Sequence, residues 1–249
     1  MISNKLVGAA MSLALIAASD PKAEKTITAH NVVLVHGAFA DGSGWNVVSA
    51  ILTKHGFHVT VVQPPETSLE DDVAATNRAL DQQAGPTVLV GHSYGGIIIT
   101  AAGNHANVKS LVYVAAFQPD TGESLVSLGQ HIPPASKAIK PTSDGYLYFD
   151  SASFQADFAA DLPASQAEYM ARSQVYLSLK AATSGASSPA WKNKPSFAVV
   201  ATKDRAINPA LERFMYKRAR ATTIELSASH AVYISQAPAI AALIEKAAQ

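Results

Sequence analysis

Short apolar runs alternate with longer amphipathic segments over most of the chain. Six runs are rich in β-branched residues and apolar on both faces, which is the pattern of strands in a parallel sheet that helices cover on both sides. They span Asn31–Val35, Phe57–Gln63, Thr87–Val90, Ser110–Ala115, Phe197–Ala201 and Thr222–Leu226. Apolar positions at helical spacing predict helices over Ser43–Lys54, Leu69–Gln83, Ile97–His105 and Pro238–Ala248. This alternation predicts a doubly wound α/β domain with a mostly parallel sheet.

Two of the helices begin with local signals. Ser68 with Asp71 has the spacing of a capping box, and Pro238 suits the first turn of the last helix. Glu70, Asp71 and Asp72 are typical of first-turn acids that the helix dipole favours, and as such they need no partner.

One interval departs from this alternation of strands and helices. About 75 residues, 118–194, separate two strands, far more than an ordinary connection with one helix. We expect an inserted, mainly helical cap across the carboxyl edge of the sheet, where α/β proteins bind ligands. The alternative is an ordinary helical excursion with its own small aromatic core. The aromatic residues of the interval are Tyr146, Tyr148, Phe149, Phe154, Phe158, Tyr169, Tyr176 and Trp191.

The first 25 residues have the layout of a secretory signal. Met1–Lys5 carries one positive charge, Leu6–Ala18 is uncharged, and small residues lead into the polar stretch Asp20–Lys25. Thirteen residues are fewer than the about 20 that span a bilayer, so we expect no stable membrane insertion. We predict a signal peptide and polar linker over 1–25, export to the bacterial periplasm or the medium, and an α/β domain over 26–249. An N-terminal helix packed on a cytoplasmic domain, or a misassigned start codon, is the alternative.

The composition narrows the classes of function. The chain has 249 residues, 19 basic and 19 acidic side chains, a net charge of zero and no cysteine. Balanced charge offers no basic field for phosphate backbones, so we expect no nucleic-acid partner. The absence of cysteine excludes disulfides, thiolate nucleophiles and cysteine metal ligands. The length lies within the range of one domain.

The strongest chemical signal is the segment Gly91–Gly96, with the sequence GHSYGG. It follows a predicted strand and precedes a predicted helix, the context that a G-x-S-x-G nucleophile turn requires. The turn is so tight that its central residue adopts a strained backbone and side chains at the glycines would collide with neighbouring segments. It lifts the hydroxyl of Ser93 clear of the sheet, at the amino end of a helix. We therefore expect Ser93 to be a nucleophile.

A serine nucleophile needs a base, and the base needs an acid to orient it. Asp204 follows the strand Phe197–Ala201 and His230 follows the strand Thr222–Leu226. Both residues therefore come to the sheet edge that carries Ser93, in the chain order serine, acid, histidine. We predict His230 as the base and Asp204 as the acid, with Asp120 as an alternative acid.

The segment from His36 to Phe39 follows the first strand, at the position from which such folds direct a backbone N–H toward the nucleophile. We expect the N–H groups of Ala38 and Tyr94 to form an oxyanion hole, and Gly37 to leave room for this approach. A glycine-rich turn without a catalytic task is the alternative.

These motifs resemble the α/β-hydrolase superfamily, and within it the small cofactor-free serine esterases related to plant methylesterases and hydroxynitrile lyases. The resemblance runs from about Asn31 to the C-terminus and is carried by VVLVHGAFADGSGW, LVGHSYGG, LVYVAAFQPD, TKDRAINP and SHAVYISQ. It implies a six-stranded sheet, a helical cap, the nucleophile Ser93, the acid Asp204 and the base His230. The lyases of this branch typically have threonine at the position of Gly37 and lysine at that of Ala231, which argues against cyanohydrin cleavage.

We therefore expect hydrolysis of small or medium, apolar or aromatic carboxylic esters through an acyl-enzyme on Ser93, without a metal or organic cofactor. Phe39, Phe117 and the aromatic residues of the cap are expected to line the substrate pocket. The alternatives are a hydrolase-like sensor that binds a small molecule with slow or no turnover, and an acyltransferase or perhydrolase that shares the acyl-enzyme.

The predicted signal peptide is tested by the mass of the mature protein. Exported protein should lack about the first 20–25 residues, because signal peptidase cleaves after the apolar segment. Intact-mass measurement on periplasmic or secreted material checks this. Recovery of the full-length chain from the cytoplasm alone would contradict export.

Overall fold

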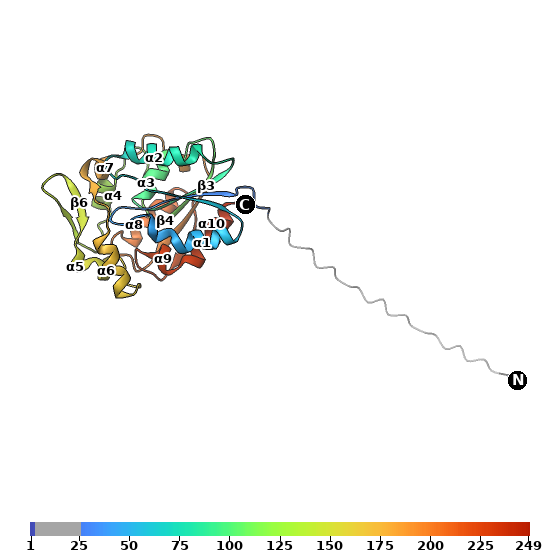
Figure 1. Cartoon of the computed structure of the whole chain (residues 1–249). Helices are drawn as coiled ribbons and strands as arrows, with labels where there is room; N and C mark the ends of the chain where they lie inside the picture. Colours follow the sequence, from blue (N-terminus) through green and yellow to red (C-terminus); the bar gives the residue numbers. More distant parts are fainter. Residues whose placement is uncertain (3–25) are drawn as a thin grey trace.

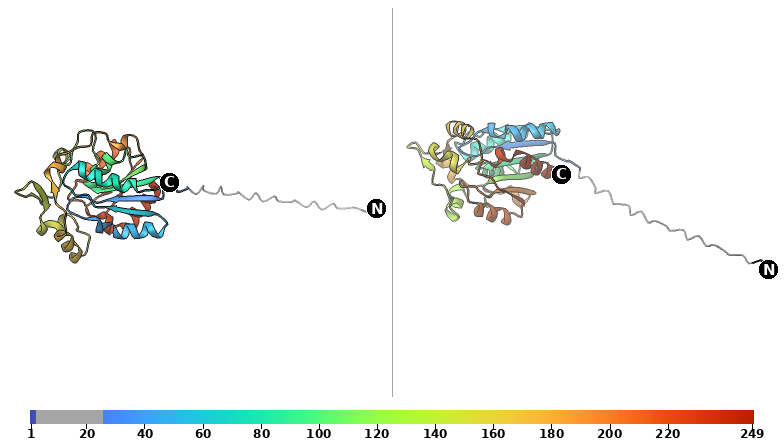
Figure 2. Two further views of the ribbon diagram at one scale, coloured as in Figure 1. Left: turned by 45° about the horizontal axis from the view of Figure 1, so that its top comes forward. Right: turned by 90° about the horizontal axis from the view of Figure 1, so that it is seen from below.

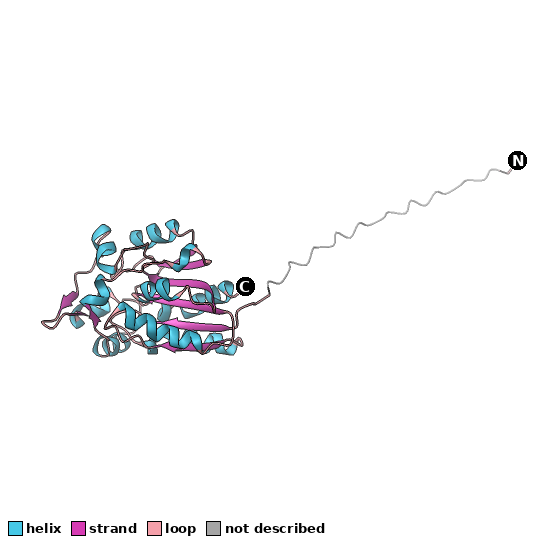
Figure 3. Cartoon of the chain, turned by 90° about the horizontal axis from the view of Figure 1, so that it is seen from above, coloured by secondary structure: helices cyan, strands magenta, loops and turns pink. Residues whose placement is uncertain are grey.

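A parallel sheet of six strands forms the centre of the protein (Figure 3). The computed structural model describes residues 1–2 and 26–249; most of the predicted signal peptide lies outside the described residues. The strand order is β2-β1-β3-β4-β8-β9, and every neighbouring pair is parallel. The strands span β1 Asn31–Val35, β2 His58–Val62, β3 Thr87–Ser93, β4 Val108–Ala116, β8 Ser196–Ala201 and β9 Thr222–Leu226. The six predicted strands and the α/β fold are therefore confirmed.

Helices cover both faces of this sheet (Figure 1 and Figure 2). Along β1, Val32 and Leu34 contact one apolar cluster while Val33 and Val35 contact the other, so the strand is buried on both sides. Burial on both faces explains why the strands are continuous apolar runs without alternation. One face carries η1 (Gly42–Trp45), α1 (Asn46–Lys54), α9 (Val232–Ser235) and α10 (Ala237–Ala247); the other carries α2 (Leu69–Asp81), α3 (Gly95–Ala102) and α8 (Pro209–Arg218).

The predicted helix starts are largely confirmed. The hydroxyl of Ser68 accepts the N–H of Asp71 at 3.1 Å, and Pro238 lies in the first turn of α10. The second half of the capping box differs from the prediction: the Asp71 carboxylate accepts the hydroxyls of Thr67 and Ser68, each at 2.8 Å.

The chain between β4 and β8 forms the cap, which lies at one end of the sheet, opposite the C-terminus of the chain (Figure 1). Its helices are α4 (Leu125–His131), α5 (Ser151–Asp157), α6 (Ala164–Arg172), α7 (Leu179–Thr183) and η2 (Ala190–Lys192). It also contains an antiparallel sheet of β5 (Ile139–Pro141), β6 (Tyr146–Phe149) and β7 (Leu177–Ser178), which the expectation of a mainly helical cap did not include. Strands of two to four residues are too short for an alternating pattern to be recognised.

No helix in the described part of the chain has both the length and the apolar character needed to cross a membrane.

The close approach of α3 to the end of β4 yields a prediction about stability. A methyl group at Gly96 would overlap the carbonyl oxygen of Phe117 in the backbone after β4. We expect Gly96→Ala to destabilise the protein by about 1–3 kcal/mol, because two backbone segments must move apart. Urea unfolding measures the change.

Gly129→Ala is the matched control, because this glycine also lies in a helix, α4, but has nothing within 4 Å of an added methyl group. It should be neutral or stabilising by about 0.5–1 kcal/mol. Equal stability of both variants would show that the approach of α3 to β4 is not tight.

Candidate active site

Ser93 lies at the sharp turn between β3 and α3. Its backbone φ is +53°, in the left-handed region, which confirms the strain that the motif predicts. Side chains at the flanking glycines would collide with backbone: a methyl at Gly91 would lie 2.5 Å from the carbonyl oxygen of Gly95, and one at Gly95 would lie 2.7 Å from that of His36. Only glycine fits these positions, so the turn can fold closely against β1 and present Ser93 at the end of the sheet.

Asp204 and His230 form a buried pair beside Ser93. Nδ1 of His230 lies 2.5 Å from Oδ2 of Asp204, and the other oxygen, Oδ1, accepts the N–H groups of Ala206 at 2.7 Å and Ile207 at 2.9 Å. Because a carboxylate can only accept, Nδ1 donates to Asp204, which leaves Nε2 as the nitrogen that can act as a base. Both residues are buried, at 4% and 1% exposure.

The alternative acid, Asp120, is engaged elsewhere. Its carboxylate forms an ion pair with Lys192 and accepts the N–H of Thr121 at 2.6 Å. The described structure therefore pairs His230 with Asp204 and not with Asp120.

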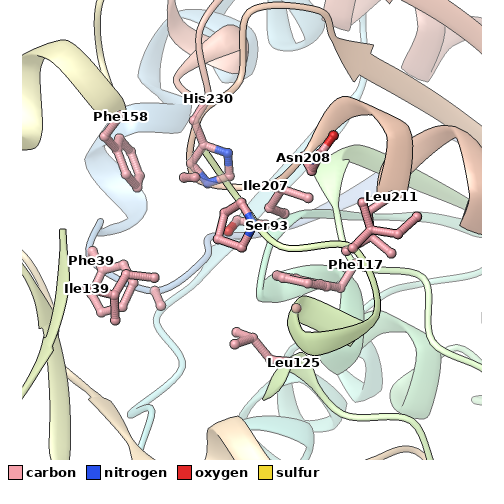
Figure 4. Close-up of a pocket in the computed structure, with 15 residues that line it drawn as sticks. Phe39, Ser93, Phe117, Leu125, Ile139, Phe158, Ile207, Asn208, Leu211 and His230 are labelled. Atoms are coloured by element: carbon pink, nitrogen blue, oxygen red, sulfur yellow. The ribbon is translucent and has the colours of Figure 1, made fainter. Parts of the chain in front are cut away.

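Ser93 and His230 line the same cavity (Figure 4). The close-up shows the ring of His230 above Ser93, with Phe117 and Leu125 below. Oγ of Ser93 forms no hydrogen bond with another described residue, so it is available to a molecule in the cavity. The structure therefore brings together the three side chains that the sequence motifs singled out.

His92, the residue before Ser93, holds the backbone at His230 in place. Its Nε2 donates to the backbone carbonyl of His230 at 3.0 Å, and the two rings are 4.6 Å apart between centroids. Complete burial, followed by the effect of the nearby His230, lowers the pKa of His92 well below its ordinary value. A neutral His92 adds no positive charge next to His230, as a proton acceptor requires.

The loop after β1 lies directly against the nucleophile turn. A methyl group at Gly37 would lie 2.5 Å from Cβ of Ser93 and 3.1 Å from the backbone nitrogen of Tyr94, so a larger residue would displace the loop. Within the described residues, the N–H groups of Ala38 and Tyr94 donate no hydrogen bond, and Ala38 lines the cavity. Two unpaired N–H groups at this position are what an oxyanion hole requires.

A buried network fixes Tyr94 from the opposite side. The Tyr94 hydroxyl donates to Oδ2 of Asp72 at 2.7 Å, and Oδ1 of Asp72 accepts the N–H of Glu66, also at 2.7 Å. Asp72 lies in the first turn of α2, as predicted, but its side chain is fully buried and accepts the Tyr94 hydroxyl, a contact that the sequence interpretation did not include. Burial raises the pKa of Asp72, and that of Glu66 rises well above its usual range. A sequence pattern gives no means to separate Asp72 from its exposed neighbours Glu70 and Asp71.

The cavity beside Ser93 is mostly apolar. Phe39 and Phe117 line it, as predicted, but of the cap aromatics only Phe158 does so. Tyr169 and Tyr176 are exposed instead. The remaining apolar lining comes from aliphatic side chains that the sequence interpretation missed: Leu125, Ile132, Pro134, Ile139, Ile207 and Leu211.

Among the described residues, no cluster of three or more histidine or acidic side chains could hold a metal ion.

Comparison with known proteins places the chain in a family. A model described as the alpha/beta hydrolase family matches residues 32–243, so the chain belongs to the alpha/beta hydrolase family. A curated relative, a carbendazim hydrolyzing esterase from Nocardioides sp. (strain SG-4G), is 32% identical in an alignment of 123 residues that covers 43% of this chain. The chain covers 51% of that relative's length.

Solved structures share the fold over most of the chain. A pyrethroid hydrolase from Sphingobium faniae JZ-2 superposes with a TM-score of 0.74 at 21% identity, covering 89% of this chain and 98% of that one. A methylesterase from Arabidopsis superposes with a TM-score of 0.70 at 17% identity, covering 87% of this chain and 98% of that one. The predicted fold and the α/β-hydrolase family are thus confirmed, and the fold is shared with a plant methylesterase.

The arrangement around Ser93 predicts a reactive serine. Fluorophosphonates attach to serines that a neighbouring base deprotonates. We expect one adduct per chain, located on Ser93 by peptide mapping, and none on Ser93→Ala. An unlabelled wild-type protein would contradict an activated serine.

The choice of acid is tested with the same probe. Asp204→Asn should label more slowly by a factor on the order of 10³–10⁴, because an amide facing Nδ1 leaves the ring in the wrong tautomer. Asp120→Asn is the control and should label at the wild-type rate. Slow labelling of the control and normal labelling of Asp204→Asn would reverse the assignment.

Proposed function

We propose that this protein is a serine esterase that hydrolyses neutral carboxylic esters through an acyl-enzyme on Ser93. The observation that carries the proposal is the shared cavity of Ser93 and His230, with His230 held through Nδ1 by a carboxylate. Membership of the alpha/beta hydrolase family and an esterase-named relative support it.

In the proposed first half-reaction, Oγ of Ser93 attacks the ester carbonyl while Nε2 of His230 takes the serine proton. Asp204 stabilises the resulting imidazolium through its hydrogen bond to Nδ1. The oxyanion binds the N–H groups of Ala38 and Tyr94, each worth roughly 2.7–4 kcal/mol because a backbone donor is fixed before reaction. His230 then protonates the leaving alcohol, and the acyl group stays on Ser93.

In the second half-reaction, Nε2 of His230 takes a proton from water, and the hydroxide attacks the acyl-enzyme. The same two N–H groups bind the second oxyanion. When this intermediate collapses, His230 returns its proton to Oγ of Ser93 and the acid leaves. No step requires a group beyond the residues named.

The cavity lining supports neutral, apolar substrates of limited size. Its polar side chains are those of Ser93, His230 and Asn208, and the Asn208 amide already donates to the carbonyl of Pro133 at 2.9 Å and accepts the N–H of Ala210. A charged acyl chain would lose its hydration without gaining a partner.

A panel of p-nitrophenyl esters tests the proposal. We expect turnover of acetate to hexanoate esters, and a more than tenfold lower kcat/KM for the succinate monoester, whose free carboxylate must enter an apolar cavity. Ser93→Ala should lower kcat by a factor of at least about 10³ with a folded structure. Equal rates of wild type and Ser93→Ala would refute the mechanism, and product analysis with added alcohols would reveal acyl transfer.

A further inference from the structure

A second buried carboxyl group lies behind the Asp204–His230 pair. Glu212 sits on α8 and is fully buried. Its Oε2 accepts the N–H of Ala201, the last residue of β8, at 3.1 Å. Its other oxygen, Oε1, is also inaccessible to water and receives no hydrogen bond from any described residue. An ionised carboxylate without a donor for one buried oxygen is strongly unfavourable.

Ala201 joins Glu212 to Asp204: its N–H donates to Glu212, and its carbonyl accepts the N–H of Asp204 at 3.0 Å. The carboxyl groups of Glu212 and Asp204 are thereby neighbours within hydrogen-bonding reach. Asp204 receives three hydrogen bonds from nitrogen, from Ala206, Ile207 and His230, and so is stable in its ionised form. Two carboxylates in contact cannot both be ionised in a dry interior, and a single proton between them forms a hydrogen bond. Because Asp204 has the three donors and Glu212 only one, the proton belongs on Glu212.

The charged and titratable groups around Glu212 do not change this assignment. Arg213 is nearby but points to the surface, where it binds Glu225 in two hydrogen bonds of 2.8 Å. The Tyr216 hydroxyl donates to the carbonyl of Ala116, and His230 lies on the far side of Asp204. Burial, and next to it the charge of Asp204, raises the pKa of Glu212 well above its ordinary value.

We propose that Glu212 is a neutral carboxylic acid that donates its proton in a hydrogen bond to Asp204, and that it acts as a positioning residue for the Asp204–His230 pair. The O–H of Glu212 holds the Asp204 carboxylate against Nδ1 of His230. Oε2 of Glu212 accepts the N–H of Ala201 and so anchors the glutamate to the end of β8. The two carboxyl groups, Asp204 and Glu212, then carry one negative charge together and not two. The imidazolium of His230 is therefore stabilised without becoming too weak an acid to protonate the leaving group. The catalytic consequence rests on the proposed esterase function; the protonation state does not.

The protonation state of Glu212 is tested by comparing the pH dependence of unfolding between wild type and Glu212→Gln. Above its usual pKa, an unfolded glutamate is ionised, whereas the folded protein keeps the proton. Folding then takes up one proton, and wild-type stability falls as pH rises toward the folded pKa. The ratio of the unfolding constants, wild type over Glu212→Gln, should increase about tenfold per pH unit between pH 5.5 and 7.5. A ratio that does not change with pH would show that Glu212 is ionised in the folded protein and would overturn the proposal.

Glu225→Gln is the matched control, because it removes the charge of an exposed glutamate on the neighbouring strand β9. Its unfolding ratio to wild type should not follow this slope. Infrared difference spectra at neutral pH give an independent readout: the protonated-carboxyl band should be reduced in Glu212→Gln and unchanged in Glu225→Gln. An unchanged band in Glu212→Gln would also overturn the proposal.

The positioning role is measured by kinetics. Glu212→Gln keeps a donor toward Asp204 and an acceptor for Ala201, so kcat should stay within about threefold of wild type. Glu212→Leu has neither and should lose at least tenfold in kcat at an unchanged KM, with a parallel loss in fluorophosphonate labelling rate. Full activity of Glu212→Leu, or a large loss in Glu212→Gln, would refute positioning. The unfolding and infrared measurements need no substrate. If the wild type shows the proton on Glu212 but has no esterase activity, the esterase proposal is wrong while the protonation of Glu212 stands.

Discussion

The site depends on the close approach of three backbone segments that only glycine permits. The turn after β3 folds against the loop after β1 and against the residues after β4, and at Gly37, Gly91, Gly95 and Gly96 any side chain would overlap a neighbouring segment. This approach holds the backbone of Ser93 in a left-handed conformation. The strain persists because the packed segments on both sides leave this residue no other conformation. The same approach places the backbone of Gly37, the residue before Ala38, directly against the N–H group of Tyr94. The geometry of the site is therefore a property of the backbone.

Around Ser93, the number of hydrogen-bond donors decides which buried carboxyl groups are ionised and which are neutral. Asp204 has three nitrogen donors and remains ionised, whereas Glu212 and Glu66 are buried with too few donors and keep raised pKa values. His92 is neutral for the same reason of burial. One negative charge thus faces His230, and the groups behind it contribute hydrogen bonds without further charge. On the proposed function, such a distribution lets the imidazole of His230 gain and lose a proton within one catalytic cycle.

Sequence patterns predict the sheet and the order of the site residues because both follow from local rules. A β-branched run buried on two faces predicts a strand, and a residue just after a parallel strand must lie at the carboxyl edge, as Asp204 and His230 do. The cap obeys no such rule, since its strands are two to four residues long and β7 pairs with β6 across the helices α5 and α6. Glu212 is missed for a different reason: an acid in the first turn of a helix is ordinarily explained by the helix dipole, although Met215 and Tyr216 share its buried face. Its hydrogen bond to the end of β8 is a tertiary contact that the sequence pattern does not show.

The division between backbone and cap explains where selectivity arises. On the proposed function, the reacting groups lie at the carboxyl end of the sheet, whereas Leu125, Ile132 and Ile139 line the same cavity from the cap. The cavity has no charged side chain other than His230 when protonated, so on the proposed function substrates are distinguished by volume and apolar surface. A missing methylene in such a pocket changes transition-state binding by only about 1–3 kcal/mol. Substitutions in the cap can therefore alter which esters react by modest factors while the sheet keeps the chemistry unchanged, and the two parts can vary independently.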